Sequence, residues 1–112
     1  YKDDYIFCAG IFGETVACIL KDEGIPIMGI LDNNKAIEGS LVSNLEVRTP
    51  SIFQNKTNDE ISRLFVIVCS ERSNHFRQIT SQLEEIGLKK EQIVRKIFEV
   101  NKLKYLNQIK CI

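Results

Sequence analysis

The residues best suited to binding a ligand form a glycine-containing turn close to the N-terminus. The turn at residues 8–13 reads Cys-Ala-Gly-Ile-Phe-Gly and follows a short apolar run. A dinucleotide-binding turn uses one glycine where the backbone approaches a pyrophosphate, and another where the helix packs on the strand. About 20 residues later, an acid at the end of the next strand binds ribose hydroxyls. Gly10, Gly13 and Asp32 occupy these places, so the sequence predicts a nucleotide site around them.

Side chains beside these three residues complete the predicted site. Ile11 and Phe12 lie inside the turn, Asn33 follows Asp32, and Ser70 ends a later apolar run. The full set of predicted ligand contacts is Gly10, Ile11, Phe12, Gly13, Asp32, Asn33 and Ser70. The predicted ligand is a nucleotide, with NAD or a nucleotide-sugar as the cofactor classes that suit such a turn.

The same residues can also be explained without a ligand. The two glycines would allow a strand and a helix to pack closely, and Asp-Asn-Asn at residues 32–34 is a favourable turn sequence in any protein. Cys8 stands where the dinucleotide fingerprint has its first glycine. Two of the three glycines are therefore present, and both interpretations stay open.

His75 is the only histidine and starts a predicted helix at the edge where α/β domains bind ligands. A lone histidine is most often structural. No nucleophile, base and orienting group can be assembled around it, and no carboxylate pair is placed for acid-base chemistry. Residues 70–73 form a polar loop beside it that would meet the distal half of a ligand. We therefore expect the chain to be non-catalytic on its own.

The elements that position the turn begin with a strand, a helix and a second strand. Residues 5–9 form an apolar run typical of a strand buried on both faces. From Glu14 apolar residues recur at helical spacing until Gly24, a typical helix stop. Residues 25–31 are apolar again and predict a second strand. Such a unit has parallel strands and a right-handed crossover.

The remainder of the chain predicts a second unit of the same kind. Apolar and polar residues alternate over residues 45–48, which predicts a short third strand that leads into a helix start at Thr49-Pro50. Residues 54–60 predict a loop or one irregular turn. Residues 64–69 are the strongest strand signal.

The last third of the chain predicts a helix and two further elements. The helix after the fourth strand should be capped by Asn74 and closed by Gly87. Residues 93–94 suggest a fifth, edge strand, and residues 103–109 suggest a terminal helix.

Together these elements predict an α/β fold: a three-layer Rossmann-like domain with a parallel sheet of strand order 3-2-1-4-5. Residues 1–112 form one domain, with Gly10, Asp32 and Ser70 at its ligand edge. Because the first and fourth strands are then neighbours, Cys8 and Cys69 should lie near each other as reduced thiols.

Composition narrows the class of partner and the compartment. Fifteen basic residues balance fifteen acidic ones, which argues against nucleic acid as a partner. The four cysteines lack paired spacing, which excludes a typical zinc site and favours a reducing compartment. No apolar stretch approaches the ~20 residues of a membrane span, and no signal pattern is present, so we expect a cytoplasmic protein. The absence of an initiator Met at Tyr1 suggests a fragment of a longer protein.

Several motifs together resemble an accessory Rossmann-like domain of bacterial surface-glycan enzymes. They are Cys-Ala-Gly-x-x-Gly from Cys8, Gly-Ile-Leu-Asp-Asn-Asn from Gly29, Glu38-Gly39, Val47-x-x-Pro50 and the apolar strand from Leu64. Similar domains accompany nucleotide-sugar dehydratases, sialic-acid-type acyltransferases, FkbM-type methyltransferases and some glycosyltransferases. The resemblance implies binding of a nucleotide, a nucleotide-sugar or NAD beside an attached catalytic domain, or a role only in organising the larger enzyme. The chain could also form a homodimer.

Three further functions remain as alternatives to this binding module. The domain could have lost its ligand and serve assembly alone, as Cys8 and the bulky Ile11 and Phe12 would suggest. It could be a small methyltransferase or dehydrogenase, against which the lack of a catalytic constellation argues. A nucleotide-sensing regulatory domain of potassium transport systems has a similar glycine turn and terminal acid.

Overall fold

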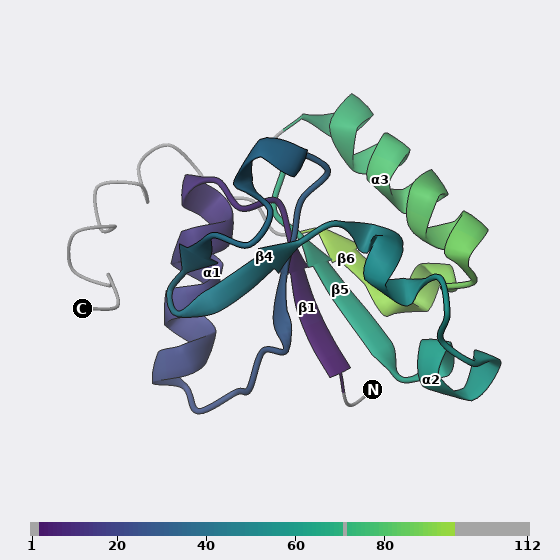
Figure 1. Ribbon diagram of the computed structural model, residues 1–112, viewed down its shortest axis with the longest axis horizontal. Coiled ribbons are helices and arrows are strands. Elements are labelled where there is room, and N and C mark those ends of the chain that lie inside the picture. Colours follow the sequence, from purple (N-terminus) through teal and green to yellow (C-terminus); the bar gives the residue numbers. More distant parts are fainter. Residues whose placement is uncertain (1–2, 71, 96–112) are drawn as a thin grey trace.

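The sheet at the centre of the computed structural model contains six strands in the order β3-β4-β2-β1-β5-β6 (Figure 1). The structure describes residues 3–70 and 72–95. The strands are β1 (Asp3–Phe7), β2 (Gly29–Leu31), β3 (Leu41–Val42), β4 (Leu45–Arg48), β5 (Leu64–Val68) and β6 (Ile93–Arg95). All neighbouring pairs are parallel except β3 and β4. The predicted order of the five parallel strands is confirmed, and a short antiparallel edge strand, β3, is added.

Helices cover both faces of this sheet. They are α1 (Ile11–Asp22), α2 (Asn58–Ser62) and α3 (Ser73–Ile86), with 3-10 turns at Lys35–Ile37, Pro50–Phe53 and Lys90–Gln92. Figure 1 shows α1 on one side of the strands and α2 and α3 on the other. None of the helices in the described part of the chain is long and apolar enough to cross a membrane.

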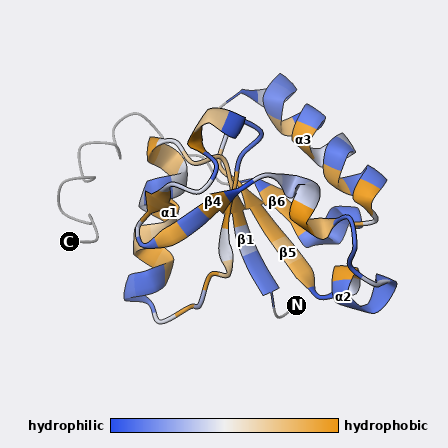
Figure 2. Ribbon diagram, in the orientation of Figure 1, coloured by the Kyte–Doolittle hydropathy of each residue, from blue (hydrophilic) through white to orange (hydrophobic). Residues whose placement is uncertain are grey.

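The alternation of side chains along β1 divides the core between the two faces. Tyr5 and Phe7 pack in one apolar cluster with Leu83 of α3, whereas Ile6 packs in a second cluster with Val16 of α1. This is the period of two expected for a strand that is buried on both faces. Figure 2 shows that β5, beside β1, is hydrophobic along its length. The predicted three-layer arrangement is confirmed.

The helix stop after α1 follows the sequence, but the second strand does not. Gly24 adopts a φ of +76°, and the Ile25 N–H donates back to the Leu20 carbonyl at 2.9 Å. Ile25 therefore takes part in the turn that caps α1, and Pro26 has no N–H to donate to a sheet. Met28 is 60% exposed. The prediction of a strand over residues 25–31 was too long, because the first backbone hydrogen bond to β1 comes from the Met28 N–H, which donates to the Asp4 carbonyl at 2.8 Å, and the paired register starts with Gly29 opposite Tyr5.

The predicted cap of α3 was also wrong. The helix begins at Ser73 with Arg72 as the capping residue, and Asn74 lies inside its first turn, where its side-chain oxygen accepts from Arg77. The close of the helix at Gly87 is confirmed, with a φ of +122° that favours glycine. The predicted terminal helix at residues 103–109 lies outside the described residues.

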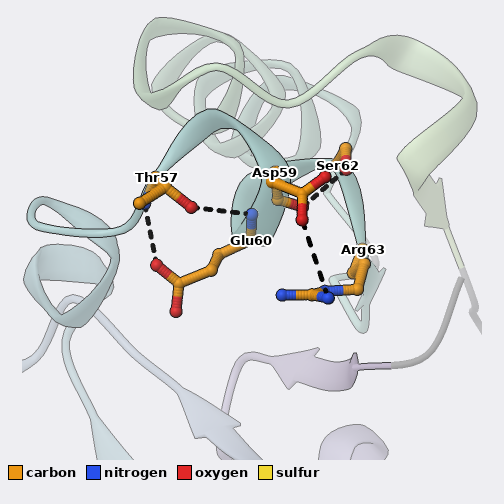
Figure 3. A network of polar contacts seen from close by, with 5 residues as sticks. All are labelled: Thr57, Asp59, Glu60, Ser62 and Arg63. Atoms are coloured by element: carbon orange, nitrogen blue, oxygen red, sulfur yellow. Dashed lines mark hydrogen bonds and ion pairs between the residues drawn. The ribbon is translucent and has the colours of Figure 1, made fainter.

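The polar segment before β5 forms a capped helical turn. In α2 the Thr57 hydroxyl accepts from the Glu60 N–H at 3.1 Å, and the Glu60 carboxylate accepts from the Thr57 N–H at 2.9 Å (Figure 3). Arg63 at the end of the helix pairs with Asp59 at 3.8 Å. This capping box satisfies amides at the start of a helix too short to be stable alone. It places Ile61 in the core under α3.

Candidate functional site

A cavity of about 780 Å³ opens at the carboxyl edge of the sheet, between the ends of β1 and β5. From β1 the chain continues through α1 to β2 on one side, and from β5 it continues through α3 to β6 on the other. The β1–α1 connection contributes Cys8, Gly10, Ile11 and Phe12 to the cavity wall. The β5–α3 connection contributes Cys69, Ser70, Arg72, Ser73, Asn74, His75 and Gln78. Crevices at such reversals of strand order are where open α/β sheets bind ligands.

The two glycines of the turn have different surroundings. A Cβ on Gly13 would lie 1.9 Å from the carbonyl oxygen of Cys8, so Gly13 is required for the helix to pack against the strand end. A Cβ on Gly10 would meet no atom within 4 Å, and the Gly10 φ of −73° suits any residue. Gly13 is therefore explained by packing, whereas the packing around Gly10 does not require a glycine.

Cys8 occupies the backbone conformation that the missing first glycine would have. Its φ is +88°, in the region that favours glycine, and its N–H donates to the Leu31 carbonyl at 2.8 Å. The tight turn of a dinucleotide fingerprint thus forms here with a cysteine. The sequence identified the position but not this strain.

Asp32 supports the turn from the end of β2. One carboxylate oxygen accepts from the Ala9 N–H at 2.9 Å, and the other accepts from the Asn34 N–H at 2.9 Å. The carboxylate therefore fixes the glycine-containing turn to β2, and it lies outside the cavity wall. Its predicted contact with a ribose stays a prediction.

Asn33 is placed away from the other predicted contacts. Its amide exchanges two hydrogen bonds with the Gln82 amide of α3, both at 2.9 Å. It lines a separate cavity of about 590 Å³ near the 3-10 turn Pro50–Phe53. Of the predicted set, only Gly10, Ile11, Phe12 and Ser70 share the cavity at the β1 and β5 ends.

Ser70 and His75 contact each other across the start of α3. The Ser70 Oγ lies 2.9 Å from His75 Nδ1 and accepts from the Arg72 N–H at 3.3 Å. Ser70 is buried and His75 is exposed. The sequence placed His75 at this edge but did not predict its pairing with Ser70.

Sequence reasoning placed Ser73 and His75 near the ligand edge but missed Asn74 and Gln78 of α3 as residues of the cavity wall. Asn74 and Gln78 both line the cavity and are four residues apart, so they lie on one face of the helix. This four-residue spacing is visible in the sequence, and it indicates a shared helix face once the helix is taken to begin at Ser73. They add uncharged hydrogen-bonding groups opposite the glycine turn.

The cavity is electrostatically suited to an anion. The N-terminal ends of α1 and α3 both lie at this cavity, and each carries a partial positive charge. Among the described residues of its wall no side chain is acidic, and Arg72 is a cation.

The two cysteines of the wall add no negative charge. Burial, with the nearby charge of Asp32, raises the pKa of the Cys8 thiol to about 12. Burial also raises the pKa of Cys69 to about 12. Both thiols are free, and the Cys69 N–H donates to the Phe7 carbonyl at 2.9 Å. The prediction that they are reduced neighbours at one sheet edge is confirmed.

Comparison with solved structures finds the same arrangement of elements. The chain matches the crystal structure of RSP, a Rex-family repressor, with a TM-score of 0.58 and 18% sequence identity, over 95% of this chain and 56% of that chain. This is a Rossmann-like domain. At 18% sequence identity the match shows a shared fold and nothing more. Comparisons of the sequence with protein-family models and with curated proteins give no match.

Two further solved structures of RSP contain ligands. The complex with β-NAD+ and operator DNA matches with a TM-score of 0.59 and 17% identity, over 95% of this chain and 54% of that chain. The complex with β-NADH matches with a TM-score of 0.58 and 18% identity, over 95% of this chain and 57% of that chain. The Rossmann-like domain thus spans a little over half the length of these neighbours.

The exclusion of nucleic acid as a partner is overturned by this comparison. A matched structure contains operator DNA, although the balanced charge of the present chain argued against such a partner. The charge argument applies to one domain only. Because this chain covers 54% of that neighbour, the net charge of the matched domain does not bear on what the remaining part of the neighbour binds.

Proposed function

We propose that this Rossmann-like domain is a nucleotide sensor, with NAD or NADH as its ligand, and that it forms part of a longer regulatory protein. The proposal is carried by the cavity between the N-termini of α1 and α3, whose described wall contains no acidic side chain. Matched structures of RSP with β-NAD+ and with β-NADH support the choice of ligand.

The phosphates of the ligand would bind at the start of α1. The unoccupied space over Gly10 leaves room for a pyrophosphate against the backbone, and the helix N-terminus favours its negative charge. Across the cavity, Ser73 and Asn74 at the start of α3 offer side-chain donors, and Arg72 offers a positive charge.

The uncharged parts of the ligand would lie against the apolar wall. Ile11 is 58% exposed at the first position of α1, and it lines the cavity with Phe12. Covering such a side chain with a base or a nicotinamide ring would remove apolar surface from water.

The ribose of the ligand would bind Asp32. Each Asp32 oxygen accepts one backbone hydrogen bond and retains a second lone pair, which leaves capacity for a ribose hydroxyl.

The test is calorimetric titration of the chain with NAD+, NADH, UDP-sugars, CDP-sugars and S-adenosylmethionine. We expect heat with NAD+ or NADH, and its loss in Gly10→Val, because the new side chain would fill the space for the phosphates. Thermal melts of the free variant should match the wild type, since a Cβ at Gly10 meets no protein atom within 4 Å.

Two other results would contradict the proposal and support a different function. Heat with UDP-sugars or CDP-sugars alone would favour the accessory role in surface-glycan enzymes. If no compound gives heat at millimolar concentration and none changes the melting temperature, the domain has an assembly role without a ligand.

A further inference from the structure

Arg95, at the end of β6, contacts the cavity loop at several points. Its Nε donates to the Ser70 carbonyl at 3.1 Å, and its Nη1 donates to the Ser73 hydroxyl at 3.2 Å. Its guanidinium carbon lies 5.6 Å from the centre of the Phe76 ring in the first turn of α3. One side chain of the edge strand therefore joins both ends of the β5–α3 loop and the helix that follows.

Ser70 and Ser73, which Arg95 contacts, stand just before α3 and at its first residue. Ser70 and Ser73 both line the cavity, and the N–H groups of the first turn of α3 follow directly. A guanidinium presents its donors in a rigid planar fork, so two bonds from the same group fix the spacing of their acceptors. Parallel pairing of β5 with β6 sets Arg95 opposite Val68, and this pairing keeps the Arg95 guanidinium beside the β5–α3 loop.

We propose that Arg95 is a positioning residue for the ligand cavity, which couples the edge strand β6 to the N-terminus of α3. Its effect on ligand affinity rests on the nucleotide-binding function proposed above. Its effect on the loop rests only on the Arg95 contacts. A displacement of β6 by the rest of a longer protein would then move the cavity wall directly.

The experiment compares Arg95→Met and Arg95→Lys with the wild type and with Arg63→Met. Arg63 is the control arginine: it pairs with Asp59, and it lies directly before β5, at the amino end of that strand, where its carbonyl accepts from the Asp3 N–H. Two quantities are measured: amide chemical shifts of the 70–76 segment without ligand, and the dissociation constant of NADH.

Both Arg95 variants should shift the amides of the 70–76 segment and weaken NADH binding about tenfold. The lysine variant should lose as much affinity as the methionine variant, because it keeps the charge but not the fork. Arg63→Met should change neither quantity. If Arg95→Met does not fold, Arg95→Lys carries the same comparison.

Unchanged loop amides in the Arg95 variants would overturn the proposal. So would wild-type NADH affinity in a variant whose loop has moved, or full affinity in Arg95→Lys, which would assign the effect to charge. If the wild type binds no nucleotide while the Arg95 variants move the loop, the proposed ligand fails and the positioning of the loop by Arg95 stands.

Discussion

Adjacent residues of the glycine-containing turn have different physical roles. Gly13 allows the close contact of α1 with the end of β1, and Cys8 accepts a φ of +88° to form the bend before it. Gly10 leaves open space at the cavity. Substitutions in one short motif should therefore separate effects on folding from effects on binding.

The first residue-scale prediction concerns Gly13. In Gly13→Ala the new Cβ would lie 1.9 Å from the Cys8 carbonyl oxygen, so α1 must shift. We expect a loss of about 3 kcal/mol in the free energy of unfolding, measured by urea titration. Gly10→Ala is the control and should lie within about 0.5 kcal/mol of the wild type. Equal stability of the two variants would contradict the packing role of Gly13.

The second residue-scale prediction concerns the thiols of Cys8, which is partly buried, and Cys69, which is buried. The pKa of Cys8 is raised from 9.0 to about 12, so the folded state keeps its proton where the unfolded chain loses it. The associated stability is fully present below pH 9 and is lost as the pH rises toward 12. Cys69 behaves in the same way.

Two measurements check the state of these thiols. Alkylation of Cys8 and Cys69 at pH 8, followed by peptide mass spectrometry, should be much slower in the folded protein than in urea. The fall in stability between pH 8 and pH 11 should be smaller in Cys69→Ala than in the wild type. Rapid labelling of both cysteines in the folded state would contradict the raised pKa of the two thiols.

At the scale of elements, the structure depends on contacts that join short segments. α2 has only five residues and β6 only three, so neither would persist alone. Gln92, immediately before β6, is 3% exposed. Its Nε2 donates to the carbonyls of Ile61 and Leu64, both at 2.8 Å. One buried amide thus joins α2, the start of β5 and the turn into β6.

Replacing this amide should destabilise all three elements together. In Gln92→Met the carbonyls of Ile61 and Leu64 would stay buried without this donor, and the Lys89 N–H would lose the Gln92 oxygen. We expect a loss of about 3 kcal/mol in urea titration. Gln54→Met, at an exposed position, should change stability by less than about 0.5 kcal/mol. A mild effect at Gln92 would mean that water reaches these carbonyls.

At the scale of the whole molecule, the cavity is built by segments from both halves of the chain. The β1–α1 connection and the β5–α3 connection meet only because β1 and β5 are neighbours in the sheet. A ligand that bridges them binds the folded state alone. Ligand binding and global unfolding should therefore be linked.

NADH should raise the melting temperature of the chain. At a hundred times the dissociation constant, linkage gives about 2.7 kcal/mol of added stability, which corresponds to a shift of about 10 °C for a domain of this size. Differential scanning fluorimetry over a series of NADH concentrations measures this shift in melting temperature. Gly10→Val is the control, and its melting temperature should not change with NADH. A shift of equal size in Gly10→Val would place the ligand elsewhere on the domain.

The sequence by itself determined the strand order, the two-sided core and the position of the glycine turn. These follow from local patterns: apolar runs, helical spacing that ends at Gly24 and Gly87, and the fixed handedness of parallel crossovers. The antiparallel β3 was not expected, because its two residues carry too little pattern to predict a strand.

Only the tertiary structure decided how the candidate site residues are used. The sequence grouped Asp32 and Asn33 with the ligand, and only the fold shows that Asp32 also accepts from the Ala9 N–H and that Asn33 is bonded to Gln82. Arg95 reaches Ser70 across 25 residues of sequence. A hydrogen-bonding side chain takes whichever partner lies within about 3 Å, and packing, not residue type, sets that distance.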